Sequence, residues 1–179
     1  MFLLSLVALA NAAAPKGWIV AGTDPSAYEA GTVPEAHTGS ASARFHSIKA
    51  KPDGFGTLMQ SMSATNYSGQ RVRMTAWVRS DTVGEWAGMW MRVDAPGENA
   101  VSFDNMGDRP IKGTTAWTRY AIVLDVPARA NVIAFGILVE GTGSVWIDDL
   151  EFEIVDDTVP LTGSAQGRTY EPINPSFEE

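Results

Sequence analysis

Apolar and polar residues alternate with a period of two along much of this chain. In the clearest run, Arg71–Ser80, every second residue is apolar: Val72, Met74, Ala76 and Val78. Successive side chains of a β-strand point to opposite faces, so this pattern predicts a strand with one buried face. No segment keeps a 3.6-residue apolar period over three turns, and long helices are therefore not expected.

Seven more strands are expected from similar runs bounded by turn residues: Trp18–Thr23, Ala43–Ile48, Gly56–Ala64, Ala87–Asp94, Trp117–Val126, Val132–Glu140 and Val145–Val155. The run Val132–Glu140 is apolar on both faces, as expected for a central strand covered on both sides. Strands that follow one another without helices pair antiparallel. The predicted fold is all-β: an antiparallel β-sandwich of the jelly-roll type.

The last of these strands carries a carboxylate among apolar residues. Trp146, Leu150 and Phe152 share one parity, and Asp148 has the same parity. A carboxylate buried on an apolar face must be paired, hydrogen-bonded or bound to a cation. Regular alternation favours Asp148 as the inward residue, although a β-bulge would exchange it with Asp149.

The composition narrows the class of protein. The chain has 179 residues, 45% of them hydrophobic, which is enough for one domain with a substantial core. A formal net charge of −8 argues against binding to nucleic acid or to an anionic membrane surface. There is no cysteine, so disulfides do not stabilise the fold.

The N-terminus reads as a secretory signal. Phe2–Ala10 is an apolar run too short to span a bilayer, and Ala10-Asn11-Ala12 matches an A-x-A cleavage site. We therefore expect a signal peptide at 1–14 and a secreted or periplasmic protein with no stable membrane insertion after cleavage. The remaining divisions are a β-sandwich at 15–155, a linker at 156–171 and a strand at 172–179. That strand either completes the sandwich or begins another module.

The two ends of the sandwich resemble galactose-binding-like jelly rolls, which include several families of carbohydrate-binding modules. The resemblance rests on Gly17-Trp18 near the start, on Asp148-Asp149 in the closing strand, and on the Asn-x-x-Phe-Glu motif Asn174–Glu178. In those modules this motif opens the first strand, whereas here it stands at the C-terminus. The resemblance implies a structural calcium ion held by Glu178 together with Asp148 or Asp149. The alternative is a carboxylate satisfied by turn amides or by an arginine.

The middle of the chain resembles a group of bacterial domains often labelled transcriptional regulators. The segments that carry this resemblance are Phe55–Gln60, Trp86–Asp94 and Phe103–Thr115. The sequence shows no helix-turn-helix, and its charge does not suit DNA.

A candidate ligand site follows from four large side chains on the polar faces of two predicted neighbouring strands: Trp77, Trp90, Arg73 and Arg92. Tryptophan rings stack on sugar rings, and arginine donates directional hydrogen bonds to hydroxyls. The loop Asp104–Thr115 is expected to rim this face with Asp104, Asn105 and Arg109. The alternative is that the tryptophans pack under loops and the arginines are solvated.

No motif for catalysis was found. The chain lacks G-x-S-x-G, H-E-x-x-H and cysteine, and its two histidines, His37 and His46, are expected to be structural or solvated. The predicted function is that of a non-catalytic module for a saccharide or another polyhydroxylated small molecule. The alternative is a protein-interaction domain, or a sensor or accessory domain of a bacterial exported or regulatory system.

Overall fold

A computed structural model describes residues 13–163. The leader before residue 13 and the C-terminal strand at 172–179, with Glu178, lie outside the described residues, so both stay predictions. Ala14, which the predicted leader includes, packs against the core of the sandwich. No helix among residues 13–163 is long and apolar enough to cross a membrane.

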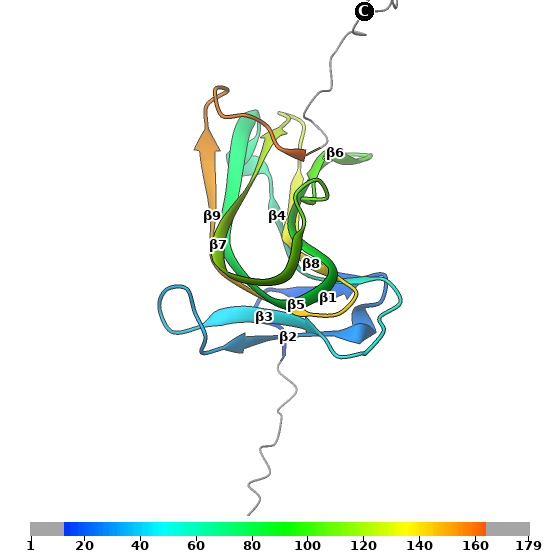
Figure 1. Cartoon of the computed structure of the whole chain (residues 1–179). Coiled ribbons are helices and arrows are strands. Elements are labelled where there is room, and N and C mark those ends of the chain that lie inside the picture. Colours follow the sequence, from blue (N-terminus) through cyan, green and yellow to red (C-terminus); the bar gives the residue numbers. More distant parts are fainter. Residues whose placement is uncertain (1–12, 164–179) are drawn as a thin grey trace, which may run out of the picture.

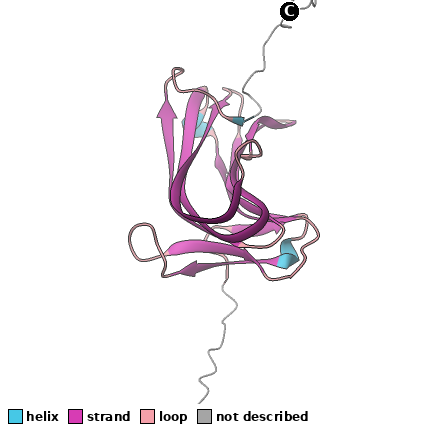
Figure 2. Ribbon diagram, viewed as in Figure 1, coloured by secondary structure: helices cyan, strands magenta, loops and turns pink. Residues whose placement is uncertain are grey.

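Nine antiparallel strands form the described part (Figures 1 and 2). Their bounds are β1 Ile19–Gly22, β2 Tyr28–Val33, β3 Ser42–Ser47, β4 Phe55–Ser63, β5 Gln70–Ala95, β6 Glu98–Asp104, β7 Ile111–Val126, β8 Val132–Glu140 and β9 Ser144–Val155. Two short 3₁₀ turns, Pro25–Ala27 and Thr65–Tyr67, lie between strands. The predicted all-β sandwich is confirmed.

The strand β5 belongs to both layers of the sandwich. Its first half pairs with β7 and β9, and its second half pairs with β8 and β6, while the start of β7 follows β5 past the bend as far as the pair Ala87 and Ile111. Through β5, all nine strands are hydrogen-bonded into one continuous sheet that folds into two layers. We call the layer β1-β4-β8-β5-β6 the first sheet and the layer β7-β5-β9-β3-β2 the second sheet. Between the halves the register with β7 shifts three times and Thr82 adopts a positive φ of 51°. The predicted strands Arg71–Ser80 and Ala87–Asp94 are thus two halves of one bent strand.

The core lies between the two sheets and follows the predicted alternation. Val72, Met74, Ala76 and Val78 are fully buried, as are Met89 and Met91 in the second half of β5. In β8, Ile133 and Ile137 enter this core, whereas Ala134 and Leu138 pack with Trp90 on the other face of the sheet. The prediction of a central strand covered on both sides is therefore confirmed.

Besides residues 81–86 in the middle of β5, three pieces of strand were not expected from the sequence. The strands β2 and β6 and the first part of β7 were assigned to loops or left unassigned. These segments lie at the edges of their sheets, each paired to one neighbouring strand. Edge strands have little apolar surface to bury on one side, so their alternation is weak; β6, for example, has no fully apolar face.

A β-bulge in β9 overturns the predicted orientation of Asp148. Residues 149 and 150 lie opposite a single residue of β5, and Asp149 has a φ of 49°. Before the bulge, Val145 and Ile147 enter the core and Asp148 lies on the opposite face, beside Trp77. After it, Leu150 and Phe152 pack against the core. The bulge therefore reverses the parity, and the inward placement of Asp148 was wrong.

Gly136, in the middle of β8, is required by the close approach of β4. A Cβ atom at this position would lie 2.2 Å from the carbonyl oxygen of Leu58. We expect Gly136→Ala to destabilise the protein by about 3 kcal/mol, because backbone atoms of two paired strands must move apart. Chemical denaturation followed by circular dichroism measures this loss; a variant within 0.5 kcal/mol of wild type would contradict the observed strand spacing.

Candidate functional site

A large hollow lies on the face of the first sheet that points away from the core. It has a volume of about 710 Å³ and is mostly apolar. Its apolar lining includes Phe55, Met59, Trp86, Trp90, Phe103 and Leu138, and its polar lining includes Thr57, Arg92, Asn105 and Glu140. We call this hollow the aromatic pocket. Apolar concave sites with a few polar groups are the usual form of small-ligand sites in proteins.

Hydrogen bonds fix the two indole rings of the aromatic pocket. The Nε1–H of Trp90 donates to the hydroxyl of Thr57 at 2.7 Å, and that hydroxyl donates to the carbonyl of Ile137 at 2.9 Å. The Nε1–H of Trp86 donates to the carboxylate of Glu140. Trp90 is 8% exposed and forms part of the floor, while Trp86 is half-buried. The rings are therefore held in place before any ligand arrives.

Polar and aromatic side chains from β5 and β6 stand on one side of the pocket. Arg92 pairs in register with Phe103, and its Nη2 donates to Asp94 at 2.9 Å. Asn105 follows directly after β6 and approaches β5 so closely that a Cβ on Gly88 would lie 2.8 Å from the Asn105 carbonyl oxygen. Gly88 thus lets the loop after β6 reach the pocket.

The predicted patch of four side chains does not form. Trp90 and Arg92 line the aromatic pocket, but Trp77 and Arg73 belong to the first half of β5 and face outward on the second sheet. Arg73 forms an ion pair with Glu153 at 2.6 Å. The prediction failed because the two segments are consecutive parts of one strand that changes sheets, and not two paired strands.

Trp77 packs under a loop, as the alternative interpretation stated. The His37 ring stacks on it with centroids 3.8 Å apart and planes 13° apart, and the His37 ring also forms a T-shaped contact with Trp117. The stacked His37 ring occupies one face of Trp77. His37 therefore has a structural position here, in line with its expected role.

Of the three residues expected in the loop after β6, one reaches the aromatic pocket. Asn105 lines it, whereas Asp104 is 2% exposed and accepts a hydrogen bond from Arg109 Nη2 at 2.6 Å. Asp104 also accepts the backbone N–H of Met106, and Arg109 donates to the carbonyl of Ala121. Asp104 and Arg109 thus hold the loop, which is shorter than predicted because Ile111 already begins β7.

Removal of the Arg109 guanidinium is expected to leave the buried carboxylate of Asp104 without its charged partner. We expect Arg109→Met to lower the free energy of unfolding by about 3 kcal/mol. The matched control is Arg129→Met, since the ion pair of Arg129 with Glu98 is more than half exposed on both sides and should contribute much less to stability. Urea denaturation of both variants makes the comparison; equal losses would contradict the role of Arg109.

The carboxylates of the closing strand anchor the loop that follows β2. Asp148 Oδ2 accepts the backbone N–H groups of His37 at 2.8 Å and Thr38 at 3.2 Å. Asp149 accepts the Thr38 hydroxyl at 2.6 Å and contacts His37 Nδ1 at 2.8 Å. The alternative of a carboxylate satisfied by turn amides therefore describes Asp148.

The calcium site stays a prediction. Within residues 13–163, no three His, Cys, Asp or Glu side chains are grouped so that they could hold a metal ion. Glu178, the third predicted ligand, lies outside the described residues.

The contacts of Asp149 make the loop sensitive to acid. Hydrogen bonds from Thr38 and then from His37 hold the pKa of Asp149 below its ordinary value of 3.8. A lowered pKa in the folded state means that this carboxylate stabilises the fold above pH 3.8 and that the contribution is lost as the pH falls through the lowered value.

We therefore expect Asp149→Asn to be less stable than wild type at neutral pH and to approach wild type in strong acid. Thermal unfolding of both proteins between neutral pH and about pH 2 measures the difference. A difference between the two proteins that stays constant across this range would contradict the assigned contacts.

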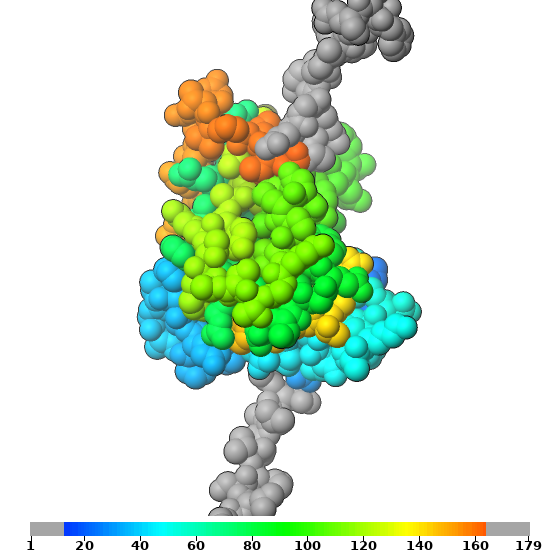
Figure 3. Space-filling model, in the orientation of Figure 1, coloured from blue at the N-terminus to red at the C-terminus, as the bar shows by residue number. Residues whose placement is uncertain are grey.

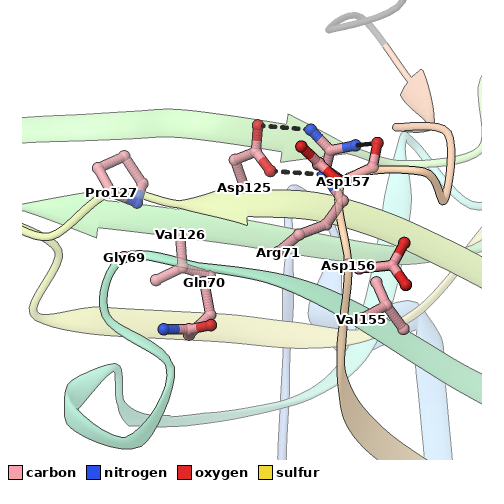
Figure 4. Close-up of a pocket in the computed structure, with 9 residues that line it drawn as sticks. All are labelled: Gly69, Gln70, Arg71, Asp125, Val126, Pro127, Val155, Asp156 and Asp157. Carbon is pink, nitrogen blue, oxygen red and sulfur yellow. Dashed lines mark hydrogen bonds and ion pairs between the residues drawn. The ribbon is translucent and has the colours of Figure 1, made fainter.

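Another hollow, of about 410 Å³, lies between the ends of β5, β7 and β9 (Figure 4). Arg71 fills part of it and donates to Asp125 and to the carbonyls of Asp157 and Val159. Thr162, further along, donates its N–H to the carbonyl of Val123 on β7. The segment 156–163, within the predicted linker, thus packs on the sandwich (Figure 3), and the guanidinium in this hollow is already paired.

Several residues of the aromatic pocket were not expected from the sequence, notably Trp86, Phe103 and Glu140. A signal was present for two of them. Trp86 has the same parity as Trp90, and Glu140 has the same parity as Leu138, so each pair shares a face of its strand. Phe103 lay in a segment that was not recognised as a strand.

Comparison with known sequences gives one informative relative. The chain is 44% identical over 168 residues to the uncharacterized HTH-type transcriptional regulator YbfP of Bacillus subtilis strain 168. The match covers 92% of this chain but 57% of YbfP, so the chain spans little more than half the length of that relative. The predicted resemblance to domains labelled transcriptional regulators is confirmed. No family model matches the chain.

Similar solved structures confirm the jelly-roll sandwich. A family 61 carbohydrate-binding module in complex with β-1,4-galactotriose has a TM-score of 0.53 at 17% identity, covering 78% of this chain and 90% of the module. The family 22 module of Clostridium thermocellum xylanase 10B, solved with its catalytic module and xylohexaose, gives 0.59 at 14%, covering 82% of this chain and 28% of that one. The enzymatically active domain of tailspike protein 4 from bacteriophage CBA120 gives 0.61 at 19%, covering 78% and 20%.

Proposed function

We propose that this chain is a non-catalytic saccharide-binding module and that the aromatic pocket is its binding site. The observation that carries the proposal is the pair Trp86 and Trp90, which stand on one face of β5 and open onto a hollow on the side of the sheet away from the core. Indole rings with fixed orientation offer flat apolar surfaces, on which the C–H faces of sugar rings stack.

The residues around these rings suit the hydroxyl groups at the edge of a stacked sugar. Asn105 supplies an amide, Arg92 a guanidinium and Glu140 a carboxylate. Hydrogen bonds that involve a charged group are stronger than neutral ones and orient the ligand. Phe103 is 36% exposed and adds a further aromatic surface on the β6 side.

The pocket chemistry supports binding without catalysis. Most glycosidases use two carboxyl groups that flank the bond that is cleaved. Among the described residues that line the aromatic pocket, Glu140 is the one carboxylate, and the indole of Trp86 donates to it. The similar carbohydrate-binding modules solved with galactotriose and xylohexaose support the same class of ligand.

A sensor role is the second candidate, and the name of YbfP favours it. In a longer protein, a saccharide-binding domain of this kind would report the ligand to another part of the chain. The net charge of −8 argues that such a domain does not itself contact DNA. An exported location is a separate proposal that rests on the predicted leader.

Loss of the Trp86 ring is expected to weaken saccharide binding. We expect Trp86→Ala to lower the affinity for bound oligosaccharides at least tenfold, because a stacking surface is removed. Trp117→Ala is the matched control, since Trp117 lies on β7 of the second sheet, beside His37. A glycan array identifies the ligands, calorimetry measures both variants, and circular dichroism checks their folding. Equal binding by wild type and Trp86→Ala would overturn the proposed site.

A further inference from the structure

The floor of the aromatic pocket is apolar, although it lies on the face of the sheet that points away from the core. Trp90, Leu138 and Ala134 form a hydrophobic cluster separate from the main core, and Phe55, Met59 and Trp86 pack against it. On the second sheet, the outward-facing Arg71, Arg73 and Arg119 each form an ion pair with a carboxylate. The apolar cluster therefore gives the pocket a floor of low polarity, and apolar concave surfaces are the usual form of small-ligand sites.

The polar atoms of this floor are already hydrogen-bonded within the protein. The Trp90 indole N–H and the Thr57 hydroxyl form a chain that ends on the carbonyl of Ile137. The Trp86 indole N–H is taken by Glu140. A sugar hydroxyl placed on the floor would give up its hydrogen bonds to water with little replacement, which is unfavourable.

Polar groups with capacity for a ligand stand instead around the floor. The guanidinium of Arg92 has several donors, and two of them, on Nε and Nη2, go to Asp94. The Asn105 side chain accepts the N–H of Gly107 through Oδ1, and its amide nitrogen remains a donor. The pocket thus divides into an apolar floor and a polar margin.

We infer that the ligand is a saccharide that carries an apolar substituent, an acyl or aryl group, and that this substituent lies on the floor against Met59 and Leu138. The inference rests on the proposed function and goes beyond it by naming the ligand class. The sugar hydroxyls then lie at the margin, near Arg92 and Asn105, where they can be hydrogen-bonded.

Three kinds of probe test this inference by calorimetry on the full chain. They are para-nitrophenyl glycosides of galactose and xylose oligosaccharides, the matching methyl glycosides, and para-nitroanisole, which has the aryl group without the sugar. We expect the aryl glycosides to bind about tenfold more tightly than the methyl glycosides, because an aromatic ring leaves water. We expect para-nitroanisole alone to bind much more weakly than either.

A pair of variants at one floor position provides the internal control. Met59→Gln keeps the length of the side chain but makes it polar, and we expect it to reduce the preference for the aryl glycoside to less than about threefold. Met59→Leu keeps the floor apolar and should retain the preference. Circular dichroism confirms that both variants fold, and the comparison of probes in wild type stands whether or not they do.

The outcomes separate the inference from the proposed function. Equal affinity for aryl and methyl glycosides would overturn the inference of an apolar substituent and leave the proposed saccharide binding intact. Binding of para-nitroanisole as tight as that of the aryl glycoside would overturn the saccharide function. Binding of none of the probes would overturn both.

Discussion

The arrangement of this protein depends on one continuous strand that serves two sheets. The strand β5 supplies buried side chains to the core along its whole length, and its outward side chains therefore appear on two different surfaces. The first half presents Trp77 and Arg73 to the outer face of the second sheet, and the second half presents Trp86, Trp90 and Arg92 to the aromatic pocket. The bend between the halves, around Thr82, decides which residues can meet a common ligand.

Charged side chains at the edges of the two sheets hold the loops in place by hydrogen bonds and ion pairs. Asp148 and Asp149 hold the loop after β2, and Asp104 with Arg109 holds the loop after β6. These are the charged residues that a search for a binding site would select first, because charged groups among apolar ones suggest function. In this fold their donors and acceptors are taken by neighbouring loops, which leaves the aromatic rings and the margin of the pocket for a ligand.

Much of the fold could be predicted from the sequence because burial imposes a period of two. The run from Val72 to Val78 followed this rule, and β8 was recognised because burial on both faces makes the whole strand apolar. The rule failed where a β-bulge interrupts the alternation, as at Asp149. The positive φ of Asp149 cannot be recognised from the order of apolar and polar residues. The candidate site was half predicted for the same reason: Trp90, Arg92 and Asn105 line the aromatic pocket, but no local pattern shows that β5 changes sheets before it reaches Trp86.

The position of β9 between β3 and β5 has a consequence for how the chain folds. Ala43 on β3 pairs with Ile147 on β9, so the second sheet cannot close until nearly the whole sandwich has left the ribosome. Pairings between residues this far apart in sequence cost loop entropy and form slowly. Until β9 arrives, β3 and the first half of β5 each present an unpaired edge, and nascent or truncated chains are therefore exposed to misassembly with other extended segments.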